Sequence, residues 1–291
     1  TSVTGPEPAA ERVRRFVAEY RSRCPEDRRP PPCRIDVEAE IPPHVGLGSG
    51  TQLAMATAQL LALLAGDGAA DPRTLADRVG RGARSALGIH GFARGGFLVD
   101  GGKPLAVSPN RGVAPRNGKR GIGTIVARAE FPADWRFVLV TPTESNGLSG
   151  AAEGTAFDRL PPMPRATTER LCRLLLMDLL PAVIEADFDG CCEALERFGR
   201  TVGEYFAPVQ GGVFAHPQMR ELADRLQRQG LRGIGQTSWG PTLFILTRSM
   251  DDAEALVKNT LFGRMKDEGR MKDELTVRIA AALNHGAVVE G

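Results

Sequence analysis

The chain has 291 residues and a formal net charge of +2, from 37 lysines and arginines against 35 aspartates and glutamates. Charged residues make up 25% and hydrophobic residues 42%, which excludes a disordered, collagen-like or coiled-coil protein. The near-neutral balance gives no chain-wide reason to expect binding to nucleic acid or to a membrane surface, so an anionic ligand must be bound locally. The length suits two domains of roughly 100 to 200 residues each.

Residues 1–150 are predicted to form the first domain. Val13, Phe16, Val17 and Tyr20 recur at helical spacing, which predicts an amphipathic surface helix over 7–23. After it, apolar and charged residues alternate as in a strand with one buried face. An uncharged stretch then predicts a helix buried on most sides. The strand is expected at 35–41 and the buried helix at 52–65. Further along this domain we expect a weaker helix at 72–85 and strands at 95–99 and 137–140.

The second domain is expected over residues 151–291, after a stretch rich in Gly, Ser and Pro at 143–164. Its helices and strands are expected to form an antiparallel sheet covered by helices, and the whole chain is assigned to the α+β class. The expected elements are helices at 167–186, 195–205, 217–229 and 251–261, and strands near 235, 243–246 and 277–281. Residues 263–274 read GRMKDE twice, which we interpret as a solvated loop.

Five cysteines without a CxxC pattern are typical of reduced thiols in a cytoplasmic protein rather than of disulfides or a zinc site. No uninterrupted run of ~20 apolar residues occurs, so we expect a soluble protein without a membrane span. The chain begins at Thr1 without a methionine, and we expect that a leader has been trimmed or is not part of the sequence seen here.

The strongest local signal is a glycine-rich turn between the expected strand and the buried helix. A helix N-terminus exposes unpaired N–H groups and a partial positive charge, and glycines let a phosphate approach that backbone. The alternative is a tight turn that only packs the strand on the helix. The predicted phosphate-binding residues are Gly46, Leu47, Gly48, Ser49, Gly50, Thr51 and Gln52.

A second glycine-rich stretch, from Gly80 to Gly102, carries three arginines that suit a ligand with several anionic groups. The site residues predicted in this stretch are Arg81, Arg84, Ser85, His90, Phe97 and Asp100. Asp100 is the carboxylate best placed for a Mg²⁺ ion that bridges phosphates. Each residue also has an ordinary interpretation, because a single Arg is commonly a surface charge, an Asp before Gly-Gly a turn residue, and a His a packing residue.

Two further turns contribute polar candidates. Trp239 lies among small polar residues and could form a platform for an aromatic acceptor, or equally could anchor a domain interface. Gln236 and Ser238 share its turn, and Gln210 precedes two glycines that could face the same cavity. We assign Gln210, Gln236 and Ser238 to substrate binding, and we assign Arg84, Ser85, Asp100 and Trp239 to catalysis.

The stretch Pro43-His44-Val45-Gly46-Leu47-Gly48-Ser49-Gly50-Thr51 resembles the phosphate loop of the galactokinase, homoserine kinase, mevalonate kinase and phosphomevalonate kinase (GHMP) superfamily. With GRGxRSxxGI, GGFxVDGG, GEYFAPxQGGVF and GxGQxSWGPT, the sequence is similar more narrowly to the β-ribofuranosylaminobenzene 5′-phosphate synthase family. Two features depart from that family's pattern. The family's opening strands are absent before Thr1, and Asn284-His285-Gly286 stands where Asn-Thr-Gly is common.

The resemblance implies a ribosomal-protein-like N-terminal domain and a ferredoxin-like C-terminal domain. It also implies a Mg²⁺-dependent, decarboxylating transfer of phosphoribose from phosphoribosyl diphosphate to 4-hydroxybenzoate or 4-aminobenzoate, in the synthesis of methanopterin-type cofactors, by an enzyme that can be a homodimer. Two rival hypotheses are an ATP-dependent small-molecule kinase on the same fold and a non-enzymatic sensor of a phosphorylated metabolite.

Overall fold

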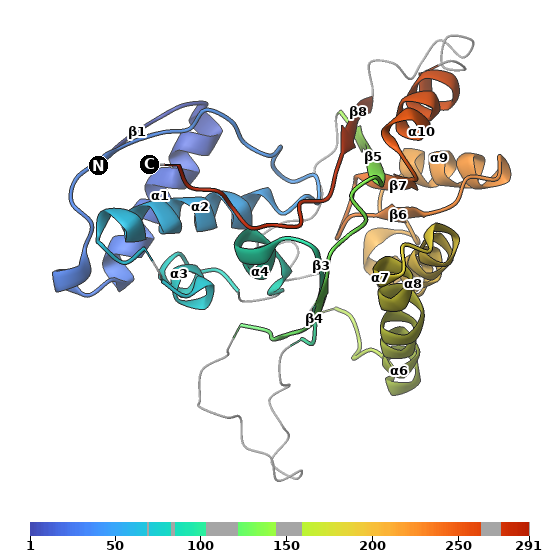
Figure 1. The fold of residues 1–291 in the computed structure, drawn as a ribbon, viewed down its shortest axis with the longest axis horizontal. Coiled ribbons are helices and arrows are strands. Elements are labelled where there is room, and N and C mark those ends of the chain that lie inside the picture. The colour runs from blue at the N-terminus through green and yellow to red at the C-terminus, as the bar shows by residue number, and fades with distance from the viewer. Residues whose placement is uncertain (69, 83–84, 103–121, 144–158, 263–274, 291) are drawn as a thin grey trace, which may run out of the picture. The chain divides into compact units, whose positions relative to one another are not determined.

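The computed structural model of the protein describes residues 1–68, 70–82, 85–102, 122–143, 159–262 and 275–290. The chain forms two compact units, each made of segments that are not contiguous in sequence (Figure 1). Unit 1 comprises Thr1–Ile41, Gly48–Arg128 and Asn284–Gly291, and unit 2 comprises Pro42–Leu47 and Ala129–Leu283. The main change of unit therefore lies between Arg128 and Ala129, earlier than the expected boundary at 150, and the expected boundary stretch falls largely outside the described residues.

Unit 1 is mainly helical. Its strands pair in twos, β1 parallel to β2 and β3 beside β4. The elements are β1 (Ser2–Thr4), α1 (Glu7–Arg23), η1 (Glu26–Arg28), β2 (Arg34–Asp36), α2 (Ser49–Leu64), α3 (Pro72–Arg78), α4 (Leu87–Arg94), β3 (Phe97–Asp100) and β4 (Ile125–Ala129). One apolar core joins α1, α2 and α3, and its largest buried side chains include Phe16, Tyr20, Met55, Leu61 and Leu75.

The expected helix over 7–23 is confirmed in full as α1. The next expected helix is α2, most of which is buried or half-buried as expected, and its exposed residues are Leu60, Leu63 and Leu64 near the C-terminal end. The strand expected at 35–41 stops at Asp36, where its three-residue partner β1 also ends. Helix α4 was not predicted, since its glycines at 88 and 91 lower helix propensity and its packing on α2 outweighs that cost.

The C-terminal residues return to unit 1 and bind beside α4. The N–H of Ala287 donates to the carbonyl of Phe92 at 2.7 Å. The guanidinium of Arg128 donates to the carbonyls of Arg94, Gly95 and Asn284, which fixes the end of α4 and the tail with one side chain.

Unit 2 contains a four-stranded antiparallel sheet in the order β6-β7-β5-β8. Helices α9 and α10 pack on one face, against Val138, Val140 and Ile245. An aromatic cluster lies with α8 on the other face, so the expected α+β architecture is confirmed. The elements are β5 (Arg136–Pro142), α6 (Arg165–Arg173), η3 (Leu174–Leu179), α7 (Leu180–Ile184), α8 (Phe188–Gln210), α9 (Pro217–Arg228), β6 (Ile234–Gln236), β7 (Leu243–Thr247), α10 (Met250–Ala255), η4 (Leu256–Phe262) and β8 (Leu275–Ala280). The GRMKDE repeat lies outside the described residues.

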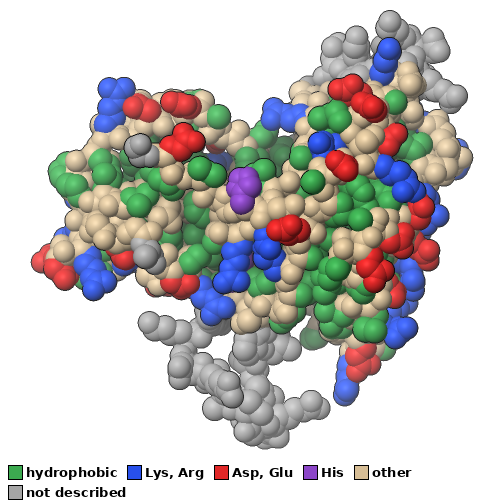
Figure 2. Space-filling model, in the orientation of Figure 1, with side chains coloured by type: hydrophobic (Ala, Val, Ile, Leu, Met, Phe, Trp, Pro, Cys, Tyr) green, Lys and Arg blue, Asp and Glu red, His purple; other side chains and the backbone are tan. Residues whose placement is uncertain are grey.

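No helix in the described part of the chain is both long and apolar enough to cross a membrane. Basic and acidic side chains are interspersed over the face drawn in Figure 2, in keeping with the net charge of +2. The structure therefore gives no sign of an extended basic surface on this face.

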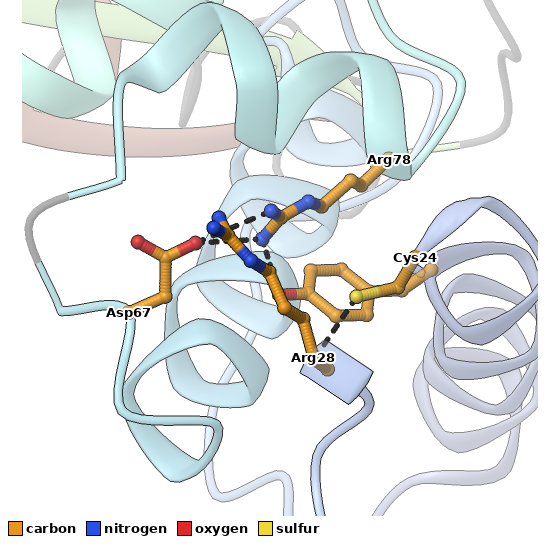
Figure 3. A network of polar contacts seen from close by, with 5 residues as sticks. Cys24, Arg28, Asp67 and Arg78 are labelled. Atoms are coloured by element: carbon orange, nitrogen blue, oxygen red, sulfur yellow. Dashed lines mark hydrogen bonds and ion pairs between the residues drawn. The ribbon is translucent and has the colours of Figure 1, made fainter. Parts of the chain in front are cut away.

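A buried polar network holds the helices of unit 1 together (Figure 3). Arg78, which is 8% exposed, donates to the hydroxyl of Tyr20 at 2.8 Å and to the carboxylate of Asp67 at 3.2 Å. Its guanidinium also lies 5.3 Å from the centre of the Tyr20 ring. This side chain thus links α1, α3 and the loop after α2.

All five cysteines are free thiols, and two of them are chemically shielded. Burial, together with smaller contributions from nearby carboxylates, raises the pKa of Cys191 and of Cys192 in α8 to about 12. We expect brief iodoacetamide treatment at pH 8 to label exposed Cys172 and to spare the two α8 thiols, as measured by peptide mass spectrometry. Denatured protein should label at all five positions. Labelling of Cys191 at the rate of Cys172 would contradict the shielding.

The same shift predicts how stability depends on pH. An unfolded thiol titrates near pH 8.5, whereas the folded α8 thiols stay protonated. Their contribution to stability is therefore complete below about pH 8.5 and is lost as the pH rises toward 12.

Candidate functional site

The predicted phosphate loop forms an uncapped helix N-terminus. Gly48 adopts a left-handed conformation at φ +73°, and no side chain caps α2. The carbonyl of Gly48 accepts from the N–H groups of Thr51 and Gln52. The N–H groups of Ser49 and Gly50 have no acceptor among the described residues. No atom lies within 4 Å of the position that a Cβ would take at Gly48. An anion could therefore approach the two unpaired N–H groups without displacing protein atoms.

The preceding part of the loop is packed rather than open. Gly46 has φ +81°, and a Cβ there would lie 2.5 to 2.8 Å from the hydroxyl and carbonyl oxygens of Thr237 and the carbonyl oxygen of Gly240. The Thr237 hydroxyl also donates to the carbonyl of Val45 at 3.4 Å. The glycine at 46 is thus needed for close backbone packing within unit 2, and the glycine at 48 leaves space for a ligand.

Helix α4 packs closely on the first turn of α2. The amide of Gln52 donates to the carbonyl of Gly88 at 2.9 Å, and a Cβ on Gly88 would lie 2.9 Å from the methyl group of Thr51. The Gln52 side chain is therefore engaged in helix packing, and its backbone N–H already donates to the carbonyl of Gly48, so the unpaired N–H groups of this turn are those of Ser49 and Gly50 among the described residues. Arg81 lies beside the same turn, with an Nη atom 3.5 Å from where a Cβ of Gly50 would be.

Asp100 is held by hydrogen bonds that fix the start of α4. Its carboxylate accepts from the N–H groups of Ala86 and Gly102, each at 2.9 Å, and from the hydroxyl of Ser85 at 3.5 Å. The Ser85 oxygen in turn accepts from the N–H of Leu87. Ser85 and Asp100, both predicted to be catalytic, thus lie together and shape the N-terminus of α4.

The role of Asp100 as a Mg²⁺ ligand stays a prediction, whereas its hydrogen bonds to backbone N–H groups are observed. Both oxygens of Asp100 already accept backbone N–H groups, and Mg²⁺ bound through protein normally needs one or two carboxylates facing it. In the described ranges, no three His, Cys, Asp or Glu side chains gather closely enough to hold a metal ion. The observed role of Asp100 is therefore to position the start of α4.

Replacing Asp100 with Asn is expected to lower the stability of unit 1 by about 1 to 2 kcal/mol, because a charged acceptor of backbone N–H groups is lost. The melting temperature should fall equally with and without Mg²⁺. Asp71→Asn serves as a control, since Asp71 is the residue before α3 but its side chain makes no capping hydrogen bond. A Mg²⁺-dependent rise in melting temperature that the wild type shows and the Asp100 variant loses would restore the metal assignment.

The other residues predicted in unit 1 are less exposed to a ligand. His90 is 7% exposed, and its Nε2 lies 3.3 Å from the carbonyl oxygen of Gly123, which favours a packing role. Phe97 begins β3 and is half-buried. Arg84 lies outside the described residues.

In unit 2 the side-chain amides of Gln210 and Gln236, both predicted to bind substrate, form hydrogen bonds with backbone groups of the same unit. Gln236 accepts from the N–H of Ala215 at 2.7 Å and donates to the carbonyl of Ser238 at 3.2 Å. Gln210 donates to the carbonyls of Gly212 and Val213. These contacts make both amides structural, so their predicted binding role has no support in the geometry.

Trp239 is buried in unit 2. It is 8% exposed and packs edge-on against Phe206, with ring centres 4.8 Å apart. An aromatic platform needs an open ring face, so this burial favours a packing role for Trp239 within unit 2.

The sequence analysis did not single out Arg15, which the structure brings to the same aromatic ring as Arg81. Arg15 on α1 points its guanidinium at Phe16, whose ring Arg81 also contacts. The only signal in the sequence is a polar stripe at positions 12, 15 and 19 of an amphipathic helix, and such a stripe normally faces solvent.

Comparison with known proteins agrees with this arrangement. Residues 9–96 match the family described as GHMP kinases N terminal domain. The fold resembles homoserine kinase from Cytophaga hutchinsonii, with a TM-score of 0.56 and 14% identity over 98% of this chain and 82% of that one. It also resembles mevalonate pyrophosphate decarboxylase from Streptococcus pyogenes, with a TM-score of 0.54 and 12% identity over 99% and 82% of the two chains.

Two curated relatives are more similar in sequence, and both are named beta-ribofuranosylphenol 5'-phosphate synthase. The protein from Archaeoglobus fulgidus is 34% identical over 88% of this chain and 76% of its own length. The protein from Methanothermobacter thermautotrophicus is 33% identical over 72% of this chain and 62% of its own length, so the chain spans less than two thirds of that relative. The chain belongs to the beta-ribofuranosylphenol 5'-phosphate synthase family and has the GHMP kinase fold.

Proposed function

We propose that the protein is a decarboxylating phosphoribosyltransferase that joins phosphoribosyl diphosphate to 4-hydroxybenzoate or 4-aminobenzoate. The ring carbon that carries the carboxylate attacks C1 of the ribose, and the bond from C1 to the diphosphate breaks. The carboxylate then leaves as carbon dioxide, and its bonding electrons restore the aromatic ring. The products are a ribofuranosyl arene 5′-phosphate, carbon dioxide and diphosphate.

The observation that supports this proposal is the uncapped N-terminus of α2, with open space at Gly48 and the Arg81 guanidinium beside Gly50. A departing diphosphate gains negative charge, and preorganised N–H groups with a nearby cation stabilise such a charge. The reaction as written requires no protein nucleophile and no strong general base, because carbon dioxide leaves where a proton otherwise would. Mg²⁺ carried by the diphosphate of the donor would add to this charge stabilisation when bound.

The experiment is a direct comparison of donors with purified protein. Phosphoribosyl diphosphate is supplied with carboxyl-labelled 4-hydroxybenzoate or 4-aminobenzoate, and ATP is supplied with the same acceptors. Carbon dioxide and diphosphate released in equal amounts would support the transferase and identify the benzoate. ADP formation would favour a kinase, and saturable binding of phosphoribosyl diphosphate without turnover would favour a sensor.

A further inference from the structure

Two arginines from distant parts of the sequence meet at one aromatic ring in unit 1. The guanidinium carbon of Arg15 lies 5.4 Å from the centre of the Phe16 ring, and that of Arg81 lies 5.0 Å from it. Arg15 comes from α1 and Arg81 from the turn that follows α3. The ring holds both guanidinium groups by cation–π contact, so their positions are set before any ligand binds.

Neither guanidinium is neutralised within the described part of the chain. The side chains of Arg15 and Arg81 make no ion pair or hydrogen bond there, and the Nε of Arg81 is buried without an acceptor. A buried N–H group without a partner costs free energy and is uncommon in folded proteins. The geometry therefore leaves donor capacity that the protein itself does not use.

The surrounding charges make this arrangement more unfavourable without a ligand. Burial lowers the pKa of Arg81, and the positive charges of Arg15 and Arg12 lower it further, against the opposing effect of Glu19. Glu19, the acid that acts on Arg81, is already engaged, since it pairs with Arg23 at 2.7 Å. A bound anion would remove the repulsion and satisfy the unused donors.

The position of Arg81 connects this cluster to the phosphate loop. One Nη atom lies 3.5 Å from the Cβ position of Gly50, in the first turn of α2. The positive end of that helix and the Arg81 guanidinium are therefore neighbours, and Arg15 is connected to them through the Phe16 ring that it shares with Arg81. A ligand with more than one phosphate group suits such a surface, because its charges can be shared between both donors.

We infer that Arg15 and Arg81 bind a phosphate group of a phosphorylated sugar, next to the group held at the N-terminus of α2. The identity of that sugar as phosphoribosyl diphosphate rests on the proposed function, whereas the phosphate site itself does not. Arginine suits this task better than lysine, because its planar fork can donate two hydrogen bonds to one phosphate.

Binding titrations test the site without relying on turnover. Wild type, Arg15→Gln and Arg81→Gln are titrated calorimetrically with phosphoribosyl diphosphate, ribose 5-phosphate and inorganic diphosphate. We expect each variant to bind phosphoribosyl diphosphate roughly tenfold or more weakly, as for loss of a charge-assisted hydrogen bond. Weakened binding of ribose 5-phosphate alone assigns the cluster to the 5′-phosphate, and weakened binding of inorganic diphosphate alone assigns it to the diphosphate.

Arg14→Gln is the matched control. Arg14 is the neighbour of Arg15 on α1, is exposed, and pairs with Glu7 at 3.0 Å, so its replacement should leave all three affinities unchanged. Arg15 is exposed, so its variant should keep the wild-type melting temperature, and it remains informative if Arg81→Gln perturbs packing.

Wild-type affinity of both variants for all three probes would overturn the site. If the wild type transfers phosphoribose while both variants bind normally, the inference fails and the proposed function stands. If no transfer occurs but the variants lose affinity as expected, the phosphate site stands and the proposed function fails.

Discussion

Replacing Gly48 with Val is expected to weaken phosphoribosyl diphosphate binding by roughly 100-fold or more, which corresponds to the loss of one or two charge-assisted hydrogen bonds. The Val side chain would enter the open space beside the unpaired N–H groups of Ser49 and Gly50. A β-branched residue also resists φ +73°, so the variant should lose about 1 to 3 kcal/mol of stability. Calorimetric titration and thermal unfolding measure the two effects separately.

Gly66→Val is a matched control at the opposite end of the same helix. Gly66 has φ +76°, and no atom lies within 4 Å of its Cβ position, so the backbone strain and the lack of steric conflict are alike. It should lose similar stability and keep its affinity for phosphoribosyl diphosphate. Equal affinity of the Gly48 and Gly66 variants would show that phosphate is bound elsewhere.

Replacing Arg78 with Met is expected to lower the stability of unit 1 by about 2 to 4 kcal/mol, since the buried Tyr20 hydroxyl and the Asp67 carboxylate lose their shared donor. The expected loss of stability is smaller than for a fully buried ion pair, because the Asp67 side chain is 31% exposed and can be hydrated. Chemical denaturation followed by circular dichroism measures the change.

Arg73→Met provides the comparison within α3. Arg73 is exposed, so its replacement should change the free energy of unfolding by less than about 0.5 kcal/mol. If both substitutions cost equally little, the network drawn in Figure 3 does not stabilise the unit.

Helices in both units and the sheet of unit 2 were largely predictable, because apolar periodicity is a local property of the sequence. Helix α1 and strand β5 follow such patterns, and both lie where the spacing places them. The strand β1 and the helix α4 carry weak local signals, since one has three residues and the other contains two glycines. Tertiary contacts form these elements, and a single sequence does not reveal such contacts.

The candidate site divides in the same way. The phosphate loop was predictable, because the N-terminus of α2 follows from a glycine-rich turn before a helix. The structural roles of Asp100, Gln210 and Gln236 were not predictable from the sequence. Each of these side chains forms hydrogen bonds with backbone groups that only the folded structure brings to it. Arg15 escaped prediction because only the packing of α1 beside the turn after α3 brings it to Arg81.

The division of the chain limits how this protein can be cut or recombined. The polypeptide passes from one unit to the other four times, at 41–42, 47–48, 128–129 and 283–284. A gene fragment that ends at Arg128 would carry Pro42–Leu47 without the Thr237 turn and would lack the tail that binds Phe92. Exchange of one continuous block therefore cannot transfer either unit intact, and a single protease cut cannot release one. The two units must be inherited, expressed and engineered together.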